Sequence, residues 1–301
     1  MEENIRLFIN YLVTEGQVSK TTLEGYERNL KRYVGYLNLN GINDFDKVRE
    51  KDVKYYMECL KLQRYDDETR ASIYTSISHY HQFLTFELKL AKSDPTVNLK
   101  RPSYSRKTPT VLTHAEIEWL LIQPDVRTSV GLRDRAILEL VYATGMRISE
   151  LTSLKLTDLN FTEKLVRCVT PKKKERWVPV GKYARVFTDR YLSDVRPLFI
   201  NNNSADTVFL TQQGGEMSRK TAWALFKEYA EKARIQKSIS LNTIRHTFAA
   251  HLLEGGMALD YVQLLLGHVT IETTEIYEIY NNMKIDLEYL RKVIHVFHPR
   301  G

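Results

Sequence analysis

A proline-rich basic segment near residue 100 constrains the fold most, because it divides the chain in two. Residues 94–109 contain three prolines among basic and small polar residues. This composition interrupts helical periodicity and is typical of an extended linker between domains. We place the linker at residues 103–110, which predicts one domain over residues 1–102 and a second over residues 111–301. A chain of 301 residues allows each domain to bury its own core.

The first domain is predicted to be all-α. Apolar residues recur at helical spacing, and no stretch shows the alternation of a strand. The expected helices are one carrying Ile5, Phe8 and Leu12 and ended by Gly16, one capped by Ser19 and running past Leu37, one over Glu50–Leu62 introduced by Asp46, and one over Asp67–Leu90.

The second domain is predicted to be mainly α with a small antiparallel sheet. A capping box over Thr113–Glu116 opens it, and further helices are expected over residues 131–145, 183–192 and 218–233. Two short β-type runs, residues 165–169 and 176–180, flank a hairpin tip at residues 171–175 that carries three lysines.

Composition narrows the class of protein. The formal net charge of +7 and a pI near 9.1 suit a polyanionic partner. Cys59 and Cys168 are the only cysteines, which excludes a disulfide framework and a cysteine zinc site. No apolar run is long enough to span a bilayer and no signal sequence is evident, so a cytoplasmic protein with no membrane partner is expected.

Three short boxes in the second domain hold the residues most suited to chemistry. In the box that runs from Leu264 to Tyr277, Gly267 is predicted to end one helix and Thr270 to cap the next. His268 then lies between the two helices, and Tyr277 lies two turns into the second. Taken alone, Tyr277 reads as a core aromatic. The boxes are Ala143-Thr-Gly-Met-Arg147-Ile-Ser-Glu150-Leu, Asn242-Thr-Ile-Arg245-His-Thr-Phe-Ala-Ala-His-Leu-Leu, and Leu264-Leu-Leu-Gly-His268-Val-Thr-Ile-Glu-Thr-Thr-Glu-Ile-Tyr277.

Two arginines, a histidine and a tyrosine in boxes of this order resemble the tyrosine recombinase (phage integrase) family, and closely its Xer branch. The resemblance covers nearly the whole chain and is strongest from about Leu112 onward. It implies an all-α, SAM-like core-binding domain followed by a mainly α catalytic domain with a small antiparallel sheet, the tyrosine recombinase fold. It also implies an enzyme that cuts and rejoins DNA without metal, ATP or any other cofactor.

The resemblance assigns catalytic roles to particular residues. Tyr277 would attack the scissile phosphate and form a 3′-phosphotyrosyl ester; Tyr280 is a competitor one turn further on. Arg147 and Arg245 would bind the nonbridging oxygens, since a guanidinium stays charged and binds anions bidentately. His268 would donate a hydrogen bond to the phosphate. Glu150, one helical turn from Arg147, would orient or shield that guanidinium.

Two positions depart from the family pattern. Asn242 stands where the family has histidine, and asparagine donates a hydrogen bond but carries no proton between groups, so a slowed enzyme is expected. Pro171 aligns with the usual hairpin lysine. Lys172, one residue along, is therefore our first candidate for the general acid that protonates the leaving 5′-oxygen, and Lys174 is the second.

Several basic and polar residues are candidates for DNA contact. Arg219 and Lys220 open a helix, whose N-terminus favours phosphate, and the family places base contacts on this helix. The other candidates are Lys173 and Arg176 in the hairpin, Lys20, Thr22 and Arg70 on polar faces of the first domain, and Arg101 and Arg106 near the linker.

The expected partners are duplex DNA with inverted-repeat sites and three further protomers, in a homotetramer or a heterotetramer. The amphipathic segment at residues 284–301 could simply close its own domain. The resemblance implies instead that it docks into a neighbouring protomer, as the family's C-terminal helix does. Resolution of chromosome, plasmid or transposon multimers competes with integration or excision of a mobile element. A DNA-binding module of the same fold that no longer cleaves is the alternative from another class, supported only by Asn242 and Pro171. A monomeric type IB topoisomerase is a third.

Overall fold

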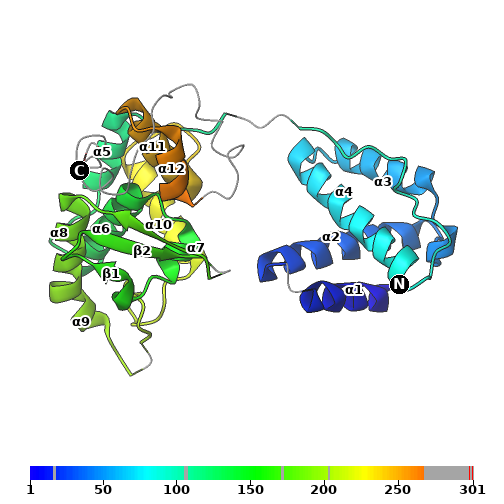
Figure 1. Cartoon of the computed structure of the whole chain (residues 1–301), viewed down its shortest axis with the longest axis horizontal. Coiled ribbons are helices and arrows are strands. Elements are labelled where there is room, and N and C mark those ends of the chain that lie inside the picture. Colours follow the sequence, from blue (N-terminus) through cyan, green and yellow to red (C-terminus); the bar gives the residue numbers. More distant parts are fainter. Residues whose placement is uncertain are drawn as a thin grey trace. The chain divides into compact units, whose positions relative to one another are not determined.

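A computed structural model describes residues 1–15, 18–104, 108–170, 173–202 and 204–267, together with residues 298 and 300. The chain forms two compact units, Met1–Lys107 and Thr108–Gly301, each drawn in Figure 1. Among the described residues, no helix combines the length and apolar character that a membrane span requires.

The first unit is helical in every element described. No β-strand occurs in its described part. The side chain of Ser19 caps the second helix by accepting a hydrogen bond from the backbone N–H of Thr22. Phe83–Glu87 continues the fourth helix as a π-helical turn, so the regular helix ends before the expected Leu90. The helices are α1 (Glu2–Thr14), α2 (Lys20–Leu39), α3 (Glu50–Leu62) and α4 (Asp67–Gln82).

Aromatic rings fill the core of this unit. Phe8 of α1 contacts Tyr26 of α2 and Tyr80 of α4, with ring centroids 5.8 and 5.4 Å apart. Tyr33 is fully buried, and its hydroxyl lies 2.9 Å from Nε2 of the buried His81. The apolar stripes expected from the sequence therefore do face one another in this unit.

The second unit is mainly helical with one small sheet, as predicted. Thr113 and Glu116 form the expected capping box, and Gly145 ends α6 in the left-handed conformation. Its elements are α5 (His114–Ile122), α6 (Ser129–Thr144), α7 (Ile148–Thr152), β1 (Leu159–Asn160), β2 (Leu165–Val169), β3 (Glu175–Pro179), α8 (Lys182–Arg190), α9 (Arg196–Phe199), α10 (Arg219–Lys232), α11 (Leu241–Glu254) and α12 (Leu259–Leu266).

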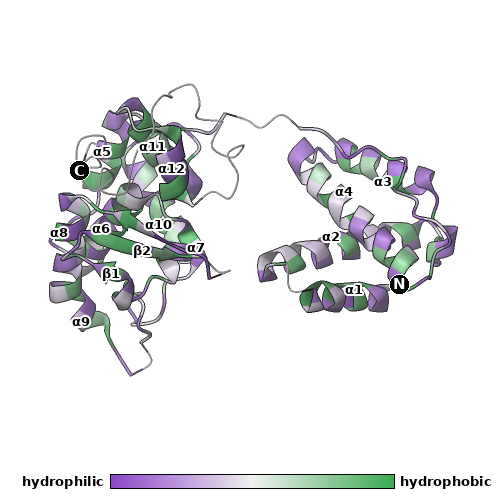
Figure 2. Ribbon diagram, viewed as in Figure 1, coloured by the Kyte–Doolittle hydropathy of each residue, from purple (hydrophilic) through white to green (hydrophobic). Residues whose placement is uncertain are grey.

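The sheet is antiparallel with strand order β1-β2-β3. In β2 and β3, Val166 pairs with Val178 and Cys168 with Arg176. All three apolar members of these pairs are buried, and Figure 2 shows hydrophobic colour along β2. The strand β1 spans only two residues and was not expected from the sequence.

Helix α6 crosses the core of the second unit. Every residue from Gly131 to Thr144 is buried, including Arg133 and Arg135, which pair with Asp134 and Glu139. Helices α8 and α11 pack against α6, while α7 contacts β2 and α12 contacts β3 (Figure 1). This packing brings the ends of α6 and α12 and the start of α7 to one place.

Some expectations fall outside the described residues. These are Gly16, Arg106, Pro171, Lys172, His268, Thr270, Tyr277, Tyr280 and the segment 284–297. Of the residues after that segment, His298 and Arg300 are described, and both are buried in the second unit. The guanidinium of Arg300 pairs with Glu118 and with Glu139, and Nε2 of His298 lies 3.3 Å from the carbonyl oxygen of Tyr142.

Candidate active site

Gly145 builds the turn that presents Arg147. Its φ of +56° is a conformation that glycine adopts without steric penalty. A Cβ at this position would lie 2.4 Å from Cδ1 of Phe248, so α11 also requires a glycine here. Two residues later Arg147 is the N-cap of α7, and its side chain is 35% exposed.

Arg245 ties the end of α6 to the end of α12. It lies on α11 and is buried. Its Nη1 donates to the carbonyl oxygen of Gly145 and its Nη2 to that of Leu266, each at 2.6 Å. The guanidinium is therefore held by two backbone oxygens that belong to different helix ends.

Arg147 also contacts the carbonyl oxygen of Leu266. Its Nη1 lies 3.4 Å from the Leu266 oxygen and 3.2 Å from Oε1 of Glu150. The C-terminal end of a helix carries partial negative charge, which stabilises nearby cations. The structure thus brings together the two arginines that the sequence predicts for phosphate binding.

Glu150 is the buried anion of this centre, with a fully buried side chain. Burial raises the pKa of its carboxyl group, but hydrogen bonds from Arg176 and from the Arg147 backbone N–H outweigh burial, and the pKa is lowered overall. Glu150 is therefore ionised at neutral pH. Its contact with Arg147 agrees with the orienting role expected from the sequence.

Arg176 differs from its expectation as a DNA contact. Its side chain is only 9% exposed, because its Nη1 and Nη2 bind the two oxygens of Glu150 at 2.8 and 2.9 Å. Its Nε donates to the Leu265 carbonyl at 2.5 Å. Alternation along β3 is the signal that reveals this placement, since Arg176 shares a face with the buried Val178.

Asn242 and Arg245 both lie on α11, as the sequence predicts. Asn242 is in the first turn and exposed, whereas Arg245 is buried one turn later. His246 is half-buried, and burial with the neighbouring Arg245 lowers its pKa. His251 is buried in the core, which agrees with a packing role.

The hairpin presents lysines to solvent. The Thr170 backbone N–H donates to the Lys174 carbonyl at 2.8 Å, and the Lys173 N–H donates to the Thr170 carbonyl at 2.8 Å. Lys173 has a φ of +58°, an uncommon conformation for a residue with a side chain. Lys173 and Lys174 are both exposed.

The remaining DNA-contact candidates fall into two groups. Lys20, Thr22, Arg101, Arg219 and Lys220 are exposed, and Arg219 and Lys220 form the first turn of α10 after the Ser218 cap. Arg70 is instead 17% exposed at its side chain and paired with Asp67 on the same helix. A phosphate contact by Arg70 would have to compete with that carboxylate.

One group among the described residues brings together side chains that ligate metals, namely His114, His251 and Glu254. Nδ1 of His251 lies 2.8 Å from the Tyr142 hydroxyl, and Nε2 lies 3.0 Å from the Leu112 carbonyl. Because a carbonyl only accepts, Nε2 carries the proton and Nδ1 accepts from Tyr142. Both nitrogens are engaged, so this group fits a metal poorly.

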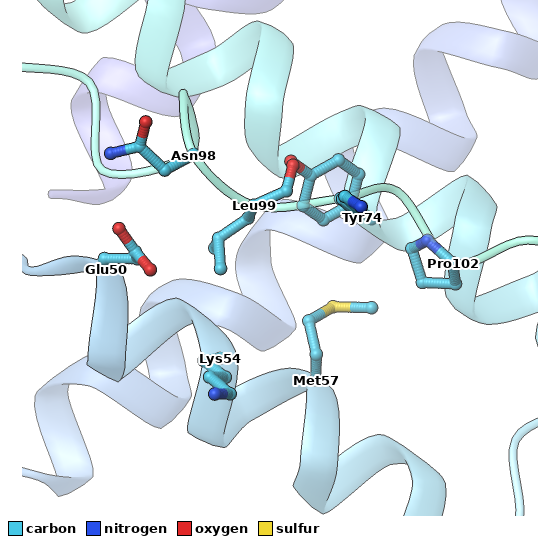
Figure 3. Close-up of a pocket in the computed structure, with 8 residues that line it drawn as sticks. Glu50, Lys54, Met57, Tyr74, Asn98, Leu99 and Pro102 are labelled. Atoms are coloured by element: carbon cyan, nitrogen blue, oxygen red, sulfur yellow. The ribbon is translucent and has the colours of Figure 1, made fainter.

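A hollow of about 330 Å³ lies in the first unit, between α3, α4 and the chain near residue 100. Met57, Tyr74 and Leu99 supply apolar walls, with Glu50 and Lys54 at the side (Figure 3). None of the candidate site residues lines it. This hollow is therefore separate from the candidate site, which lies where α6 and α12 end and α7 begins.

Comparison with known proteins shows the family to which the chain belongs. The model of the phage integrase family matches residues 110–283, and that of the phage integrase N-terminal SAM-like domain matches residues 5–87. The chain belongs to the phage integrase family. Its members include tyrosine recombinases, and this chain is a tyrosine recombinase, an enzyme of site-specific DNA recombination.

The relatives match over their full length. Tyrosine recombinase XerD of Halalkalibacterium halodurans is 36% identical over 302 residues, covering 100% of this chain and 99% of the relative. Tyrosine recombinase XerD of Chlorobaculum tepidum is 38% identical, covering 99% and 97%. The Tn1549 transposon integrase in complex with circular intermediate DNA shares the fold, with a TM-score of 0.73, 20% identity and coverage of 96% and 98%.

Proposed function

We propose that this recombinase cuts one strand of duplex DNA with Tyr277 and rejoins it to another. The observation that supports this is the convergence of Arg147 and Arg245 on the carbonyl of Leu266, two residues before His268. Two guanidiniums fixed at the helix end that precedes the Tyr277 segment in the sequence form a centre for a phosphate with two nonbridging oxygens.

Cleavage needs three events: a bond forms to phosphorus, a bond to phosphorus breaks, and the leaving oxygen gains a proton. The Tyr277 oxygen forms a bond to phosphorus and loses its proton to water, while the bond to the 5′-oxygen of the next nucleotide breaks. Lys172, or Lys174 in its place, gives a proton to that leaving oxygen. Arg147, Arg245 and His268 stabilise the charge that develops on the nonbridging oxygens. A 5′-hydroxyl from a second strand then reverses the steps, so the phosphotyrosyl ester supplies the energy for joining.

Each unit has its own part in this proposal. The helical domain over residues 1–102 and the catalytic domain over 111–301 hold duplex DNA, and the basic linker 103–110 follows the backbone between them. The Tn1549 integrase was captured on DNA, which supports a DNA partner for this chain. The exposed Lys20, Thr22, Arg101, Arg219 and Lys220 supply phosphate or base contacts.

The assembly proposed is a tetramer on two sites with inverted repeats, formed by this chain alone or with a related recombinase. It exchanges one pair of strands at a time through a Holliday junction. Segment 284–301 reaches the neighbouring protomer, which requires His298 and Arg300 to leave their contacts with Tyr142, Glu118 and Glu139 of their own unit. Two relatives that this chain covers to 99% and 97% are named tyrosine recombinase XerD, which supports the Xer branch of the family. Within that branch we propose multimer resolution rather than integration. The location proposed for this reaction on DNA is the cytoplasm.

The experiment uses a duplex selected from random sequences by binding and then nicked beside the cut position. Loss of the short fragment after cleavage traps the covalent complex. We expect a denaturation-resistant protein–DNA adduct with the unaltered chain and with Tyr280→Phe, and none with Tyr277→Phe. Binding without an adduct in all three, also when related recombinases are added, would contradict the proposal.

A further inference from the structure

Arg176 connects three parts of the active site. It lies on β3, two residues after Lys174 in the hairpin. Its guanidinium holds both oxygens of Glu150, which in turn contacts Arg147. Its Nε donates to Leu265 in the last turn of α12. The hairpin carries Lys172 and Lys174, Arg147 caps α7, and α12 precedes His268 and Tyr277. The proposed function uses residues from all three parts.

The contact with α12 is close at the point where the helix ends. Gly267 has a φ of +64°, and a Cβ on it would lie 3.1 Å from Cδ of Arg176. His268 is the next residue, and Tyr277 follows ten residues after Gly267. The Arg176 side chain therefore packs against the residue from which the nucleophile's segment begins.

Stability alone explains this pair poorly. Removing a guanidinium and a carboxylate from water is expensive, and apolar residues of similar volume often stabilise a fold equally well or better. Contact with DNA is also a poor explanation, because the side chain is 9% exposed and already bound to a carboxylate. What this arrangement does provide is a fixed distance between β3, α7 and the end of α12.

From these contacts we infer that Arg176 is a positioning residue for strand cleavage, which sets the hairpin, Arg147 and the start of the Tyr277 segment relative to one another. The inference rests on the proposed function. Arg176 touches neither the DNA nor the reacting atoms; it acts through Glu150 and the backbone of α12. Small displacements of reacting groups slow a reaction strongly, by up to about 100-fold for 1 Å.

The test measures binding and chemistry separately on the nicked duplex. For Arg176→Met we expect the adduct to form about 10- to 100-fold more slowly at saturating DNA. The dissociation constant should stay within about twofold, with an unchanged dependence on salt, because no phosphate contact is lost. Retained affinity also shows that the variant is folded.

Arg133→Met is the matched control. Arg133 is 9% exposed at its side chain, pairs with the buried Asp134 and donates to the carbonyl of Leu210. Among the site residues that the structure describes, it has no ion pair or hydrogen bond with Arg147, Glu150, Arg176 or Arg245. Like Arg176→Met, this variant should lower the melting temperature, because a buried carboxylate loses its partner, but it should leave the rate of adduct formation unchanged. Arg176→Lys keeps the charge beside Glu150 but lacks the planar fork, so its rate should stay below that of the unaltered chain.

Four results would overturn the inference. Arg176→Met could form the adduct at the unaltered rate, or Arg176→Lys could restore that rate fully. Weaker binding with a salt slope smaller by about one and an unaltered rate at saturation would show a phosphate contact instead. If the unaltered chain forms no adduct, the proposed function fails first, and the inference fails with it.

Discussion

At the scale of single residues, Asn242 stands where the family resemblance leads us to expect a histidine. An amide can hold a phosphate oxygen but cannot take up or release a proton at neutral pH. Asn242 is exposed at the start of α11, one turn from the buried Arg245. A larger side chain therefore fits at this position without disturbing the core.

Asn242→His should accelerate cleavage. A positioned acid–base group contributes about 100- to 10,000-fold in favourable cases, and we expect about a tenfold gain here because the arginines already supply most of the stabilisation. Single-turnover rates on the nicked duplex provide the measurement, with Asn242→Ala as the control that should be slower than the unaltered chain. Equal rates for the asparagine and histidine forms would show that no proton passes through this position.

A second prediction at this scale concerns which lysine, Lys172 or Lys174, is the general acid. Replacing the leaving 5′-oxygen by sulfur makes a leaving group that departs without a proton, since a thiol is far more acidic than an alcohol. Lys172→Ala should cleave normal DNA poorly and the sulfur-substituted strand well, while Lys174→Ala should behave like the unaltered chain on both. The reverse pattern would assign the role to Lys174.

Residue types and spacing predicted the members of this centre but not all of their contacts. Arg147, Glu150 and Arg245 stand in recognisable boxes, and the structure brings them together. The meeting point itself, the carbonyl of Leu266, is a backbone atom with no sequence signature. Arg176 was assigned to DNA because it lies in a lysine-rich hairpin, and its partner Glu150 is 26 residues away. Only the tertiary structure reveals such a pair.

At the scale of elements, the helices were the most predictable feature. Capping at Ser19 and Thr113 and apolar spacing set the bounds of the predicted helices to within a few residues. The π-helical turn after Gln82 and the two-residue strand β1 were missed. Both depend on packing against distant segments and leave too few residues for a periodic pattern.

The end of α6 gives a test at this scale. Gly145→Ala places a Cβ 2.4 Å from Phe248 at a φ of +56°, so we expect a loss of about 2–4 kcal/mol in the free energy of unfolding. The carbonyl of Gly145 would shift away from Arg245, and cleavage should slow as well. Urea titration measures the loss.

Gly215→Ala is the control for this variant. Its Cβ would lie 3.5 Å from the Thr211 hydroxyl, an ordinary contact, in the same unit. Its unfolding free energy should change by less than about 1 kcal/mol. Similar losses for the two variants would show that the close approach of Phe248 does not constrain this turn.

At the scale of the whole molecule, buried neutral histidines couple stability to pH. Burial lowers the pKa of His81 in the first unit to about 4, and in the second unit burial lowers those of His251 to about 4 and His298 to about 3. An unfolded histidine has a pKa of about 6.5. Between these values the unfolded chain binds more protons than the folded chain.

Stability from these histidines is therefore fully present above about pH 6.5 and is lost as pH falls toward the folded values. At pH 5 each accounts for a loss of about 2 kcal/mol. Urea titrations at pH 7.5 and pH 5 should show this loss, and His298→Gln should reduce the difference for the second unit. A free energy of unfolding that stays level between these pH values would contradict the assignment of neutral buried histidines.

The central claim is that Tyr277 becomes joined to DNA beside a centre built from Arg147 and Arg245. The most direct measurement is mass spectrometry of the adduct after digestion of its protein and DNA. We predict that the peptide containing Tyr277 carries a nucleotide through its 3′-phosphate, and that fragmentation places the added mass on Tyr277. A nucleotide on Tyr280 or on any other residue, or a phosphate attached through the 5′-oxygen, would contradict the account.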